Sequence, residues 1–403
     1  MTFLIGIVGK PSAGKSTFLN AACLTNAKMS ELPFTTIEPN KGVAYIKTKC
    51  VCQELNVDDN PKNSYCVNGD RFIPVNVLDV AGLVPDAHKG KGLGNQFLND
   101  LIRADALLHI IDISGSLDKM GKRIKMGEND PYDDILFLEK EINLWFKQIL
   151  EREDWDKFLK SHARENKKFI EELHKRLSGI KINRNQITET LKNTGLNELN
   201  PSLWSDSDLS NFSKILREKS KPIVIIANKI DRENGMENLN RLRNKYTEKI
   251  IPCSALAEYF LRTYHQEKKI EYIPGSDSFK ILDDERFNQK ELEGLKNIQD
   301  KIINPFKETG VQAVFNFTVF SILNQICVYP IADINKFSDN KGNILPDAFL
   351  VKKGTLLRDF VREKIHTEIA DHFIFGIDAR SKRRLGENYE LKHNDIIKIV
   401  TAK

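Results

Sequence analysis

The segment Gly9–Ser16 has the residue types and spacing of a loop that binds phosphates. It reads Gly-Lys-Pro-Ser-Ala-Gly-Lys-Ser, which matches the pattern G-x-x-x-x-G-K-[ST]. Glycines let the backbone wrap around phosphate oxygens with successive N–H groups pointing at them, and the start of the following helix adds its positive end. Lys15 is expected to reach the β and γ phosphates, and the Ser16 hydroxyl to ligate Mg²⁺. The predicted phosphate contacts come from Gly9, Lys10, Pro11, Ser12, Ala13, Gly14, Lys15, Ser16 and Thr17.

A second motif, Asp79-Val80-Ala81-Gly82, ends an apolar segment that is typical of a buried strand. Asp79 is expected to hold Mg²⁺ through a water molecule, as acidic residues at strand ends do in nucleotide hydrolases with this loop. Gly82 is expected to offer its N–H to the γ-phosphate. Alone, D-x-x-G is a weak signal, and its position at a strand end after the phosphate loop strengthens it.

A third motif, Asn228-Lys229-Ile230-Asp231, follows another apolar strand. The Asp231 carboxylate can accept two hydrogen bonds from the N1–H and the exocyclic amine of guanine. Adenine lacks that donor pair and would leave the carboxylate unpaired, so such a site can discriminate by about 10⁴-fold. The pattern therefore predicts guanine recognition. Backbone N–H groups of Ser254, Ala255 and Leu256 are expected to complete the pocket.

The segment 33–40, Pro-Phe-Thr-Thr-Ile-Glu-Pro-Asn, lies where a nucleotide-sensing loop belongs. A threonine hydroxyl there could join Mg²⁺ and sense the γ-phosphate, but Thr35 and Thr36 are adjacent and the residues alone do not decide between them. His88 is either a catalytic group or an ordinary loop residue. His109 lies inside an apolar strand and is expected to be a core histidine with satisfied hydrogen bonds.

The elements that must hold these motifs predict an α/β fold. Apolar runs bounded by turn residues predict strands over 3–9, 41–47, 73–79, 106–113, 222–228 and 248–252. Helical patterns separate most of them: one after Lys15, one over about 94–103 and one from near Asp133. This alternation predicts a Rossmann-like mixed sheet with helices on both faces.

Two further regions differ from this alternation. Residues 148–206 are charged, nearly free of Gly and Pro, and helical in period, which predicts an inserted helical hairpin. Near the C-terminus, short strands and a helix over 356–365, with Thr355 as its N-cap, predict a β-grasp module. The predicted strands of that module cover about 326–333, 347–352, 373–377 and 395–400. The predicted division is a G domain over 1–147 and 207–275, a helical insertion over 148–206, a helical linker over 276–325 and a β-grasp domain over 326–403.

Length and composition narrow the class of protein. The 403 residues are enough for two or three domains, and 40% hydrophobic with 29% charged residues is ordinary for a soluble globular protein. A net charge of +5 is mild and does not itself argue for nucleic acid. No apolar run approaches the roughly 18 residues of a membrane span, and Met1–Val8 is typical of a strand rather than a signal peptide. We therefore expect a cytoplasmic protein with no membrane partner.

The six cysteines do not suggest a disulfide framework. Cys50, Cys52 and Cys66 lie close in sequence, but a fourth ligand within that segment is missing, since Cys23 precedes the switch segment and His88 follows. Two interpretations stay open: ordinary reduced thiols, or a metal or redox site.

Longer segments around the motifs resemble the Obg-like GTPases, in particular their YchF-related branch. The resemblance rests on GIVGKPSAGKSTFLNA, LPFTTIEPNKGVAY and LDVAGLVPDAHKGKGLGNQFLNDLIRADALLHIID. The C-terminal FLVKKGTLLRDFVREKIH and RRLGENYELKHNDIIKIV look like a TGS domain, a ubiquitin-like β-grasp module. Within this resemblance Thr36 matches the Mg²⁺-sensing threonine. The resemblance implies a catalytic set of Lys15, Thr36 and Gly82, with His88 as a further candidate.

Three positions distinguish this chain within the family it resembles. Asp231 belongs to an intact base motif, whereas many YchF proteins have a degraded motif and accept ATP, so GTP is favoured. Ser12 stands where related potassium-activated GTPases have Asn, which leaves a K⁺ requirement open. Leu83 stands where other GTPases place a water-orienting Gln, and an apolar side chain cannot orient water. Hydrolysis is therefore expected to be slow without another residue, a cation or a partner.

The function expected from these features is a regulatory GTP switch that acts with the ribosome or RNA in translation, since TGS domains accompany such proteins. The cluster Arg380-Ser381-Lys382-Arg383-Arg384 could contact phosphates or simply form a solvated loop. A stand-alone nucleoside triphosphatase with relaxed GTP/ATP choice is the alternative, and a scaffold held together by nucleotide is a third possibility. We expect a monomer.

Overall fold

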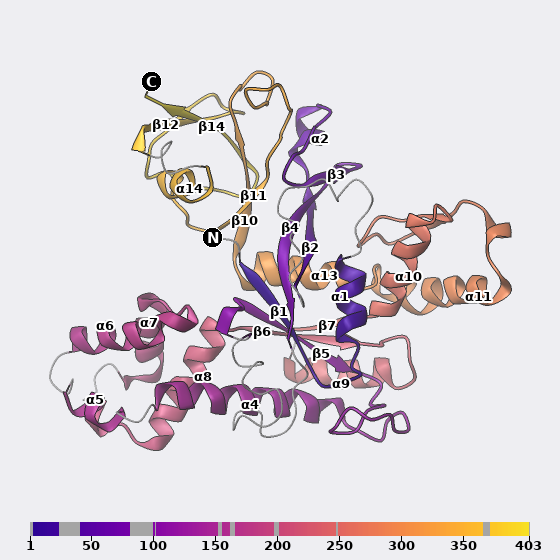
Figure 1. The fold of residues 1–403 in the computed structure, drawn as a ribbon. Helices are drawn as coiled ribbons and strands as arrows, with labels where there is room; N and C mark the ends of the chain where they lie inside the picture. The colour runs from indigo at the N-terminus through magenta and orange to yellow at the C-terminus, as the bar shows by residue number, and fades with distance from the viewer. Residues whose placement is uncertain are drawn as a thin grey trace. The chain divides into compact units, whose positions relative to one another are not determined.

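The computed structural model describes residues 3–23, 41–80, 100, 102–151, 155–161, 166–196, 201–246, 249–365 and 371–402 (Figure 1). They form two compact units. The P-loop unit takes its described residues from Leu4–Leu19 and Val77–Ala255, and the C-terminal unit from Met1–Phe3, Asn20–Asn76 and Leu256–Lys403. Among the described residues, no helix has the length and apolar character needed to cross a membrane.

A parallel sheet forms the centre of the P-loop unit, in the order β4-β1-β5-β6-β7. Its strands are β1 (Leu4–Val8), the end of β4 (Asp70–Asp79), β5 (Ala106–Asp112), β6 (Ile223–Asn228) and β7 (Ile250–Cys253). The pairs β1–β5, β5–β6 and β6–β7 are all parallel. Every residue of β5 and β6 is buried, which is why these strands appear in the sequence as continuous apolar runs. Five of the six predicted strands are therefore confirmed as elements of this sheet, with shifted ends, and the sixth, predicted over 41–47, is confirmed as β2 (Lys41–Lys49).

The helices of the P-loop unit begin with clear capping signals. Asp130 accepts a hydrogen bond from the backbone N–H of Tyr132 and precedes Pro131 at the first helical position, an arrangement that suits a helix start. A capping box at Ser205 opens a second long helix. The helices are α1 (Lys15–Cys23), which continues into the C-terminal unit, α4 (Pro131–Leu150), α5 (Trp155–Ser161), α6 (Asn166–Leu177), α7 (Arg184–Thr194), α8 (Asp206–Ser220) and α9 (Gly235–Tyr246).

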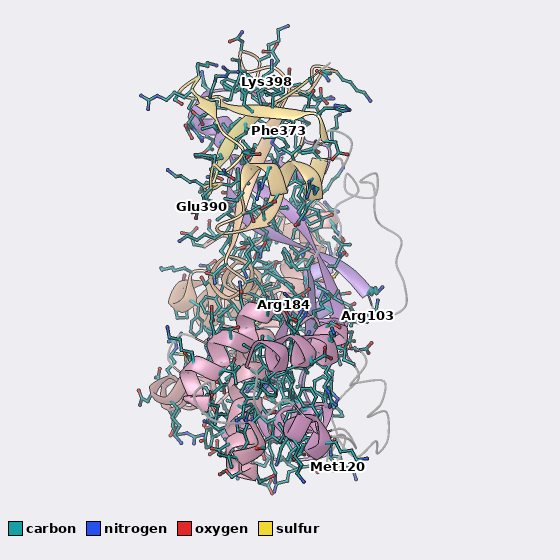
Figure 2. All side chains as sticks on the ribbon, turned by 90° about the vertical axis from the view of Figure 1, so that its left-hand side faces the viewer. Arg103, Met120, Arg184, Phe373, Glu390 and Lys398 are labelled. Carbon is teal, nitrogen blue, oxygen red and sulfur yellow. The ribbon has the colours of Figure 1, made fainter. Side chains whose placement is uncertain are left out.

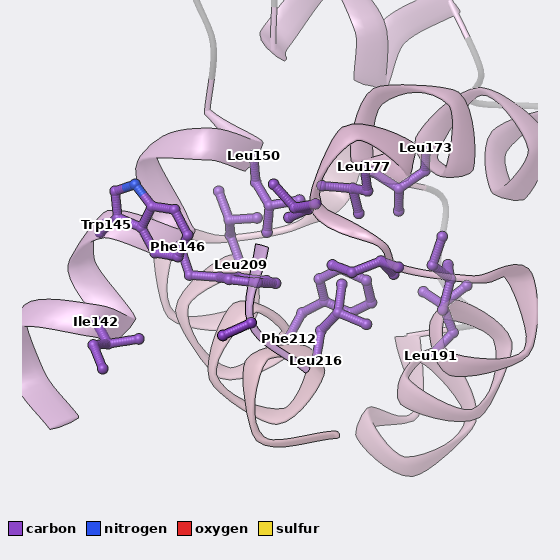
Figure 3. Packing of buried hydrophobic residues seen from close by; sticks show 14 of the residues in the cluster. Ile142, Trp145, Phe146, Leu150, Leu173, Leu177, Leu191, Leu209, Phe212 and Leu216 are labelled. Carbon is purple, nitrogen blue, oxygen red and sulfur yellow. The ribbon is translucent and has the colours of Figure 1, made fainter. Parts of the chain in front are cut away.

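The inserted region is larger than the predicted hairpin. Three helices, α5, α6 and α7, lie between α4 and α8, with short 3₁₀ turns at Ser178–Ile180 and Pro201–Leu203. Their apolar sides form one core with α4 and α8, which includes Phe146, Leu173 and Phe212 (Figure 3). The predicted helical insertion is confirmed, and the structure describes three helical segments where a two-helix hairpin was expected; residues 162–165, between α5 and α6, lie outside the described part of the chain. The predicted helix over 94–103 lies almost entirely outside the described residues.

The C-terminal unit begins with a small antiparallel arrangement that the sequence analysis described only in part. It contains β2 (Lys41–Lys49), α2 (Val51–Leu55), β3 (Tyr65–Val67) and the first part of β4. A two-residue turn at Asn68 and Gly69, both with positive φ (51° and 77°), joins β3 to β4. Asn-Gly favours this hairpin turn because its backbone twist matches that of the strands.

Helical segments connect this arrangement to a second sheet. They are α10 (Ala255–Gln266), α11 (Gln289–Ile298), α12 (Asn304–Phe306) and α13 (Val311–Asn316), with π-helical segments at Gln299–Ile303 and Phe317–Ile322, a 3₁₀ turn at Asp284–Arg286, and the short strands β8 (Ile270–Glu271) and β9 (Lys280–Ile281). The helices here agree with the linker plus helix predicted for this region.

The second sheet has five strands in the order β11-β10-β14-β12-β13, with only β10 and β14 parallel. Figure 2 labels Phe373 at the start of β12 and Lys398 within β14. The elements are β10 (Gln325–Ile331), β11 (Phe349–Lys352), α14 (Leu357–Phe360) continued by a π-helical segment (Val361–Ile365), β12 (Phe373–Asp378), β13 (Arg384–Leu385) and β14 (Asp395–Thr401). A sheet with one helix on it confirms the predicted β-grasp architecture. The predicted cap was wrong: Leu356 holds the N-cap position, and the Thr355 hydroxyl donates instead to the Lys352 carbonyl (2.6 Å).

Candidate nucleotide-binding site

The phosphate loop connects β1 to α1 and depends on its glycines. Gly9 and Gly14 have φ values of 148° and 106°, which side chains rarely adopt. A Cβ on Gly9 would lie 2.4 Å from the Ile110 carbonyl oxygen, and one on Gly14 would lie 2.3 Å from Nδ2 of Asn228. The packing of the loop therefore requires glycine at both positions. Because glycine has no side chain, the backbone at these positions can also come close to a ligand.

Lys10 and Lys15 differ in where their ammonium groups go. Lys10 is buried, and its Nζ donates to Asp134 (2.8 Å) and to the Leu117 carbonyl (2.9 Å). Only its backbone is therefore free for a phosphate. The Nζ of Lys15 donates to the carbonyl oxygens of Gly9 (3.0 Å) and Lys10 (3.1 Å), so it stays over the loop.

Asp79 ends β4 on the same side of the sheet as Lys15. Its Oδ1 is buried and has no hydrogen-bond partner in the described part of the chain. Burial raises the pKa of Asp79, and the charge of Lys15 opposes this rise. Burial likewise lowers the pKa of Lys15, opposed by Asp79. A buried acceptor without a partner fits a hydrated cation, and the exposed Ser16 can supply a second oxygen.

Asn228 ties the predicted base motif to the phosphate loop. Its side-chain amide donates to the Ala13 carbonyl (2.9 Å) and accepts from the N–H of Ala255 (3.1 Å). A single buried side chain therefore connects three loops, from the ends of β1, β6 and β7. Because each bond satisfies a buried polar group, replacing this residue would leave partners unpaired.

Lys229 makes a second connection, at a positive φ of 64°. Its Nζ donates to the Ser12 carbonyl (3.1 Å) and to Asp112 (2.9 Å). Ser114 and Ser116 each donate to Asp112 at 2.6 Å. Burial alone would raise the pKa of Asp112, but these hydrogen bonds outweigh it and hold that pKa below its usual range.

Asp112, Ser114 and Ser116 were missed by the sequence analysis. Their signal is an acidic residue at the end of an apolar strand, followed by small hydroxyl residues. That pattern is too common to be specific without the three-dimensional contact to Lys229.

The remaining base-site residues are described in part. Asp231 is half-buried in the turn after β6, where the N–H of Ile230 donates to the Cys253 carbonyl (3.2 Å). Ser254 and Ala255 are buried at the end of β7 and the start of α10. Leu256 begins the last stretch of the C-terminal unit, and its side chain is exposed.

Several predicted residues lie outside the described part of the chain: Thr36, Gly82, Leu83 and His88. His109 is buried in β5, as predicted. The prediction that its hydrogen bonds are satisfied was wrong, since its Nδ1 has no partner within the described ranges. Burial, with smaller contributions from Lys15 and Lys10, lowers the pKa of His109 to about 3.

Three regions of the chain match described protein families. Residues 4–140 match a family described as 50S ribosome-binding GTPase. Residues 226–333 match one described as Obg-like GTPase YGR210-like, G4 motif-containing domain. Residues 341–401 match the TGS domain.

Individual proteins resemble the chain over most or all of its length. An uncharacterized GTP-binding protein of Methanocaldococcus jannaschii is 44% identical over 400 residues, 99% of each chain. The crystal structure of a GTP binding protein from Pyrococcus horikoshii OT3 is 38% identical, covers 100% of both chains and superposes with a TM-score of 0.78. A ribosome-binding ATPase YchF of Haemophilus influenzae is 29% identical over 283 residues, 68% of this chain and 70% of that protein.

Proposed function

Because the chain belongs to the Obg-like GTPases of the YchF type, we propose that it binds GTP and works as a slow, Mg²⁺-dependent regulatory switch on the ribosome. The hydrogen bonds of the Asn228 side chain are the observation that carries the proposal. This side chain bonds to Ala13 in the phosphate loop and to Ala255 at the end of β7. A chain that had lost base selection would have no need of this link, since phosphates alone would hold the nucleotide.

Guanine is the base we propose, read by Asp231. The relative from H. influenzae is named an ATPase, so the family name alone does not decide the base. In this chain, Lys229 bonds to Ser12 and Asp112 and so holds the loop that precedes Asp231. A held carboxylate discriminates between bases because the wrong one leaves it unpaired.

We propose that backbone groups of the loop, together with side chains at its end, contact the phosphates. We assign these contacts to the backbone N–H groups of the loop Gly9–Gly14 other than Pro11, which has none, to the ammonium of Lys15, and to Ser16 and Thr17 at the start of α1. Lys15 is held by two carbonyl oxygens, both of which a phosphate can replace as its partner. Gly82 is proposed to donate its N–H to the γ-phosphate.

Mg²⁺ fits the oxygens that this site offers. We propose that Ser16 and Thr36 would ligate it and that Asp79 would hold it through water, which is consistent with the unpartnered Oδ1 of Asp79. When bound, the ion would neutralise charge on the phosphate oxygens. Asp79 also keeps the charge near Lys15 balanced, because each opposes the other's burial-driven pKa shift.

Slow intrinsic hydrolysis is proposed because Leu83 has no polar atom to orient water. His88 is a titratable residue in the segment that follows Leu83, and we give it a catalytic role only as a hypothesis. A partner that supplies the missing group would then switch hydrolysis on. The TGS domain at residues 341–401 and the printed name of the H. influenzae relative, a ribosome-binding protein, both favour the ribosome as that partner.

The experiment measures GTP and ATP binding and turnover by the full chain, with and without ribosomes, in K⁺ and in Na⁺ buffer. We expect GTP to bind at least about 100-fold more tightly than ATP. Turnover alone should lie well below about 1 s⁻¹ and rise with ribosomes. Acceleration by K⁺ over Na⁺ would show that Ser12 can replace the Asn of potassium-activated relatives.

The opposite result would favour the alternative, a stand-alone nucleoside triphosphatase with relaxed GTP/ATP choice, which the name of the H. influenzae relative makes worth testing. Its signature is equal affinity for both nucleotides and unstimulated turnover near about 1 s⁻¹. Sedimentation with ribosomes that ignores the bound nucleotide would also overturn the switch.

A further inference from the structure

Four side chains near the β3–β4 hairpin converge on one point of the C-terminal unit. Cys50, Cys52, Asp59 and Cys66 place one ligand atom each within 4.8 Å of all the others. We name this group the cysteine corner. The sequence analysis found no fourth ligand in the segment of its three cysteines, which was wrong, because the carboxylate of Asp59 lies among them in the structure.

Local backbone structure explains why the four side chains meet. Cys50 and Cys52 stand at the start of α2, and the N–H of Cys50 donates to the carbonyl of Gly69 in the hairpin turn (2.8 Å). The same turn, which joins β3 to β4, brings Cys66 on β3 beside Cys50 and Cys52. At the end of α2 the chain reverses through Asn56 in the left-handed region (φ 51°), which brings the following residues, up to Asp59, back to the thiols.

The separations suit a tetrahedral thiolate site. The sulfurs of Cys52 and Cys66 are 3.8 Å apart, and a tetrahedron with zinc–sulfur bonds of about 2.3 Å has edges of about 3.8 Å. The sulfur of Cys50 lies 3.2 Å from Oδ2 of Asp59, against an edge of about 3.6 Å for one sulfur and one oxygen ligand. Small side-chain rotations would complete the geometry.

Arg71 supplies the surroundings that such a site needs. Its side chain is fully buried (0% exposed) and its Nη1 donates to Asp59 at 2.8 Å. Ser64 and the Leu345 carbonyl accept its other N–H groups at 2.9 and 2.7 Å. Three thiolates and a carboxylate carry four negative charges, of which zinc would balance two and Arg71 a third. A cation hydrogen-bonded to a ligating carboxylate is the usual outer support of a metal site.

Access and burial are also consistent with a bound ion. Cys50 and Cys52 are 4% and 7% exposed, which shields these two thiols from competing water, while Asp59 and Cys66 are half-buried. An open depression lined by Cys52, Asp58, Asp59 and Cys66 leads to it from the surface. A metal site requires such an entry path as well as its ligands.

We propose that Cys50, Cys52, Asp59 and Cys66 bind one structural Zn²⁺ ion. The ion displaces the thiol protons to solvent and joins α2, the hairpin and the loop between them. The N–H groups of Asn60 and Lys62, in that loop, donate to the carbonyls of Ile344 (2.8 Å) and Pro346 (2.6 Å). The site therefore stabilises the segment that holds residues 344–346 to β3 and β4.

The test uses the full chain, purified with a thiol reductant, and measures zinc by mass spectrometry. We expect about one zinc per chain, falling below about 0.2 in C52S and in C66S. C23S is the matched control, because Cys23 lies outside the cluster, and it should keep the zinc. A wild-type chain without zinc after incubation with it, or a C66S chain with the wild-type content, overturns the proposal.

Two further readouts keep the test decisive if a variant fails to fold. Replacement by Co²⁺ in the wild-type chain should give the visible bands of tetrahedral thiolate coordination, and octahedral bands would contradict the site. Peptide mapping without reductant should find Cys52 and Cys66 as thiols. A disulfide between them would make the corner a redox pair and would overturn the metal site.

Discussion

The phosphate loop and the cysteine corner both gather polar atoms at the end of a strand, but with opposite means. At the phosphate loop, backbone groups supply most of the polar atoms. The side chains of Lys15, Asn228 and Lys229 bond to backbone carbonyls around the loop. At the cysteine corner, four side chains converge and the backbone only turns to bring them together. The phosphate loop is suited to a ligand that binds reversibly. The cysteine corner is suited to an ion that stays bound and stabilises the fold.

This difference leads to opposite expectations for substitutions. Loss of a side chain that faces the ligand, such as that of Lys15, should reduce ligand affinity and leave stability nearly unchanged. Loss of a thiol at the corner should release the ion and loosen the structure, because metal-binding free energy contributes to folding. The predictions below test the comparison, beginning with the largest effect.

Lys15→Ala should reduce affinity for GTP by at least about 1000-fold, because a charge pair with the phosphates is lost. In the described part of the chain its Nζ bonds to two loop carbonyls, which water can replace as partners, so the midpoint of thermal unfolding should change little. Isothermal calorimetry and thermal denaturation check both parts. Lys125→Ala, at an exposed lysine of the same unit, is the control. A large loss of stability in Lys15→Ala would break the comparison.

Asp231→Asn should weaken GTP binding by about 100-fold, because the amide keeps one acceptor but opposes a guanine donor with its own N–H. Affinity for ATP should stay the same or rise. Competition between the two nucleotides for a fluorescent analogue measures the ratio. Equal losses for both nucleotides would mean that the residue holds the loop rather than reads the base.

The same difference explains what the sequence could predict. The functional residues within Gly9–Ser16 follow one another in the sequence, and so do those within Asn228–Asp231. Residue types at fixed spacing therefore predict the chemistry of each segment. Asp59 is one carboxylate among many, and only the turn at Asn68–Gly69 and the reversal at Asn56 bring it to the thiols. The link from Asp112 to Lys229 was hidden for the same reason.

The fold was predicted with similar unevenness. The strands β5 and β6 were located because their sequences are nearly continuous apolar runs, as expected for strands in which every residue is buried. The interruption between α6 and α7, at the 3₁₀ turn Ser178–Ile180, was missed, since charged residues continue on both sides of it. Thr355 was misassigned as a cap because its hydroxyl can bond backward as well as forward, and it bonds to Lys352.

His109 gives the sheet beneath the phosphate loop a pH dependence of stability. Its pKa of about 3 in the folded chain lies below the ordinary value near 6.5, so protons bind the unfolded chain more readily. The stabilising contribution is complete above pH 6.5 and is lost as the pH falls toward 3. Between pH 7 and pH 5 the loss should be about 2 kcal/mol.

Urea unfolding of wild type and His109→Leu at the two pH values measures this contribution. The variant should lose less stability on acidification, by that amount. His372→Leu, at an exposed histidine of the C-terminal unit, is the control and should follow wild type. Identical pH dependence in all three proteins would show that Nδ1 of His109 finds a partner.

Arg380→Ala should have the smallest effect, less than about 2-fold on association with ribosomes. Within the C-terminal unit the Arg380 guanidinium already bonds to both carboxylate oxygens of Glu54 (2.5 and 2.8 Å) and to the Asn394 carbonyl. A paired cation gains little from a phosphate, whereas the exposed Arg383 has more to gain. Co-sedimentation at several salt concentrations should therefore give Arg383→Ala the larger loss of binding and the shallower salt dependence. Equal losses for the two variants would mean that a partner draws Arg380 away from Glu54.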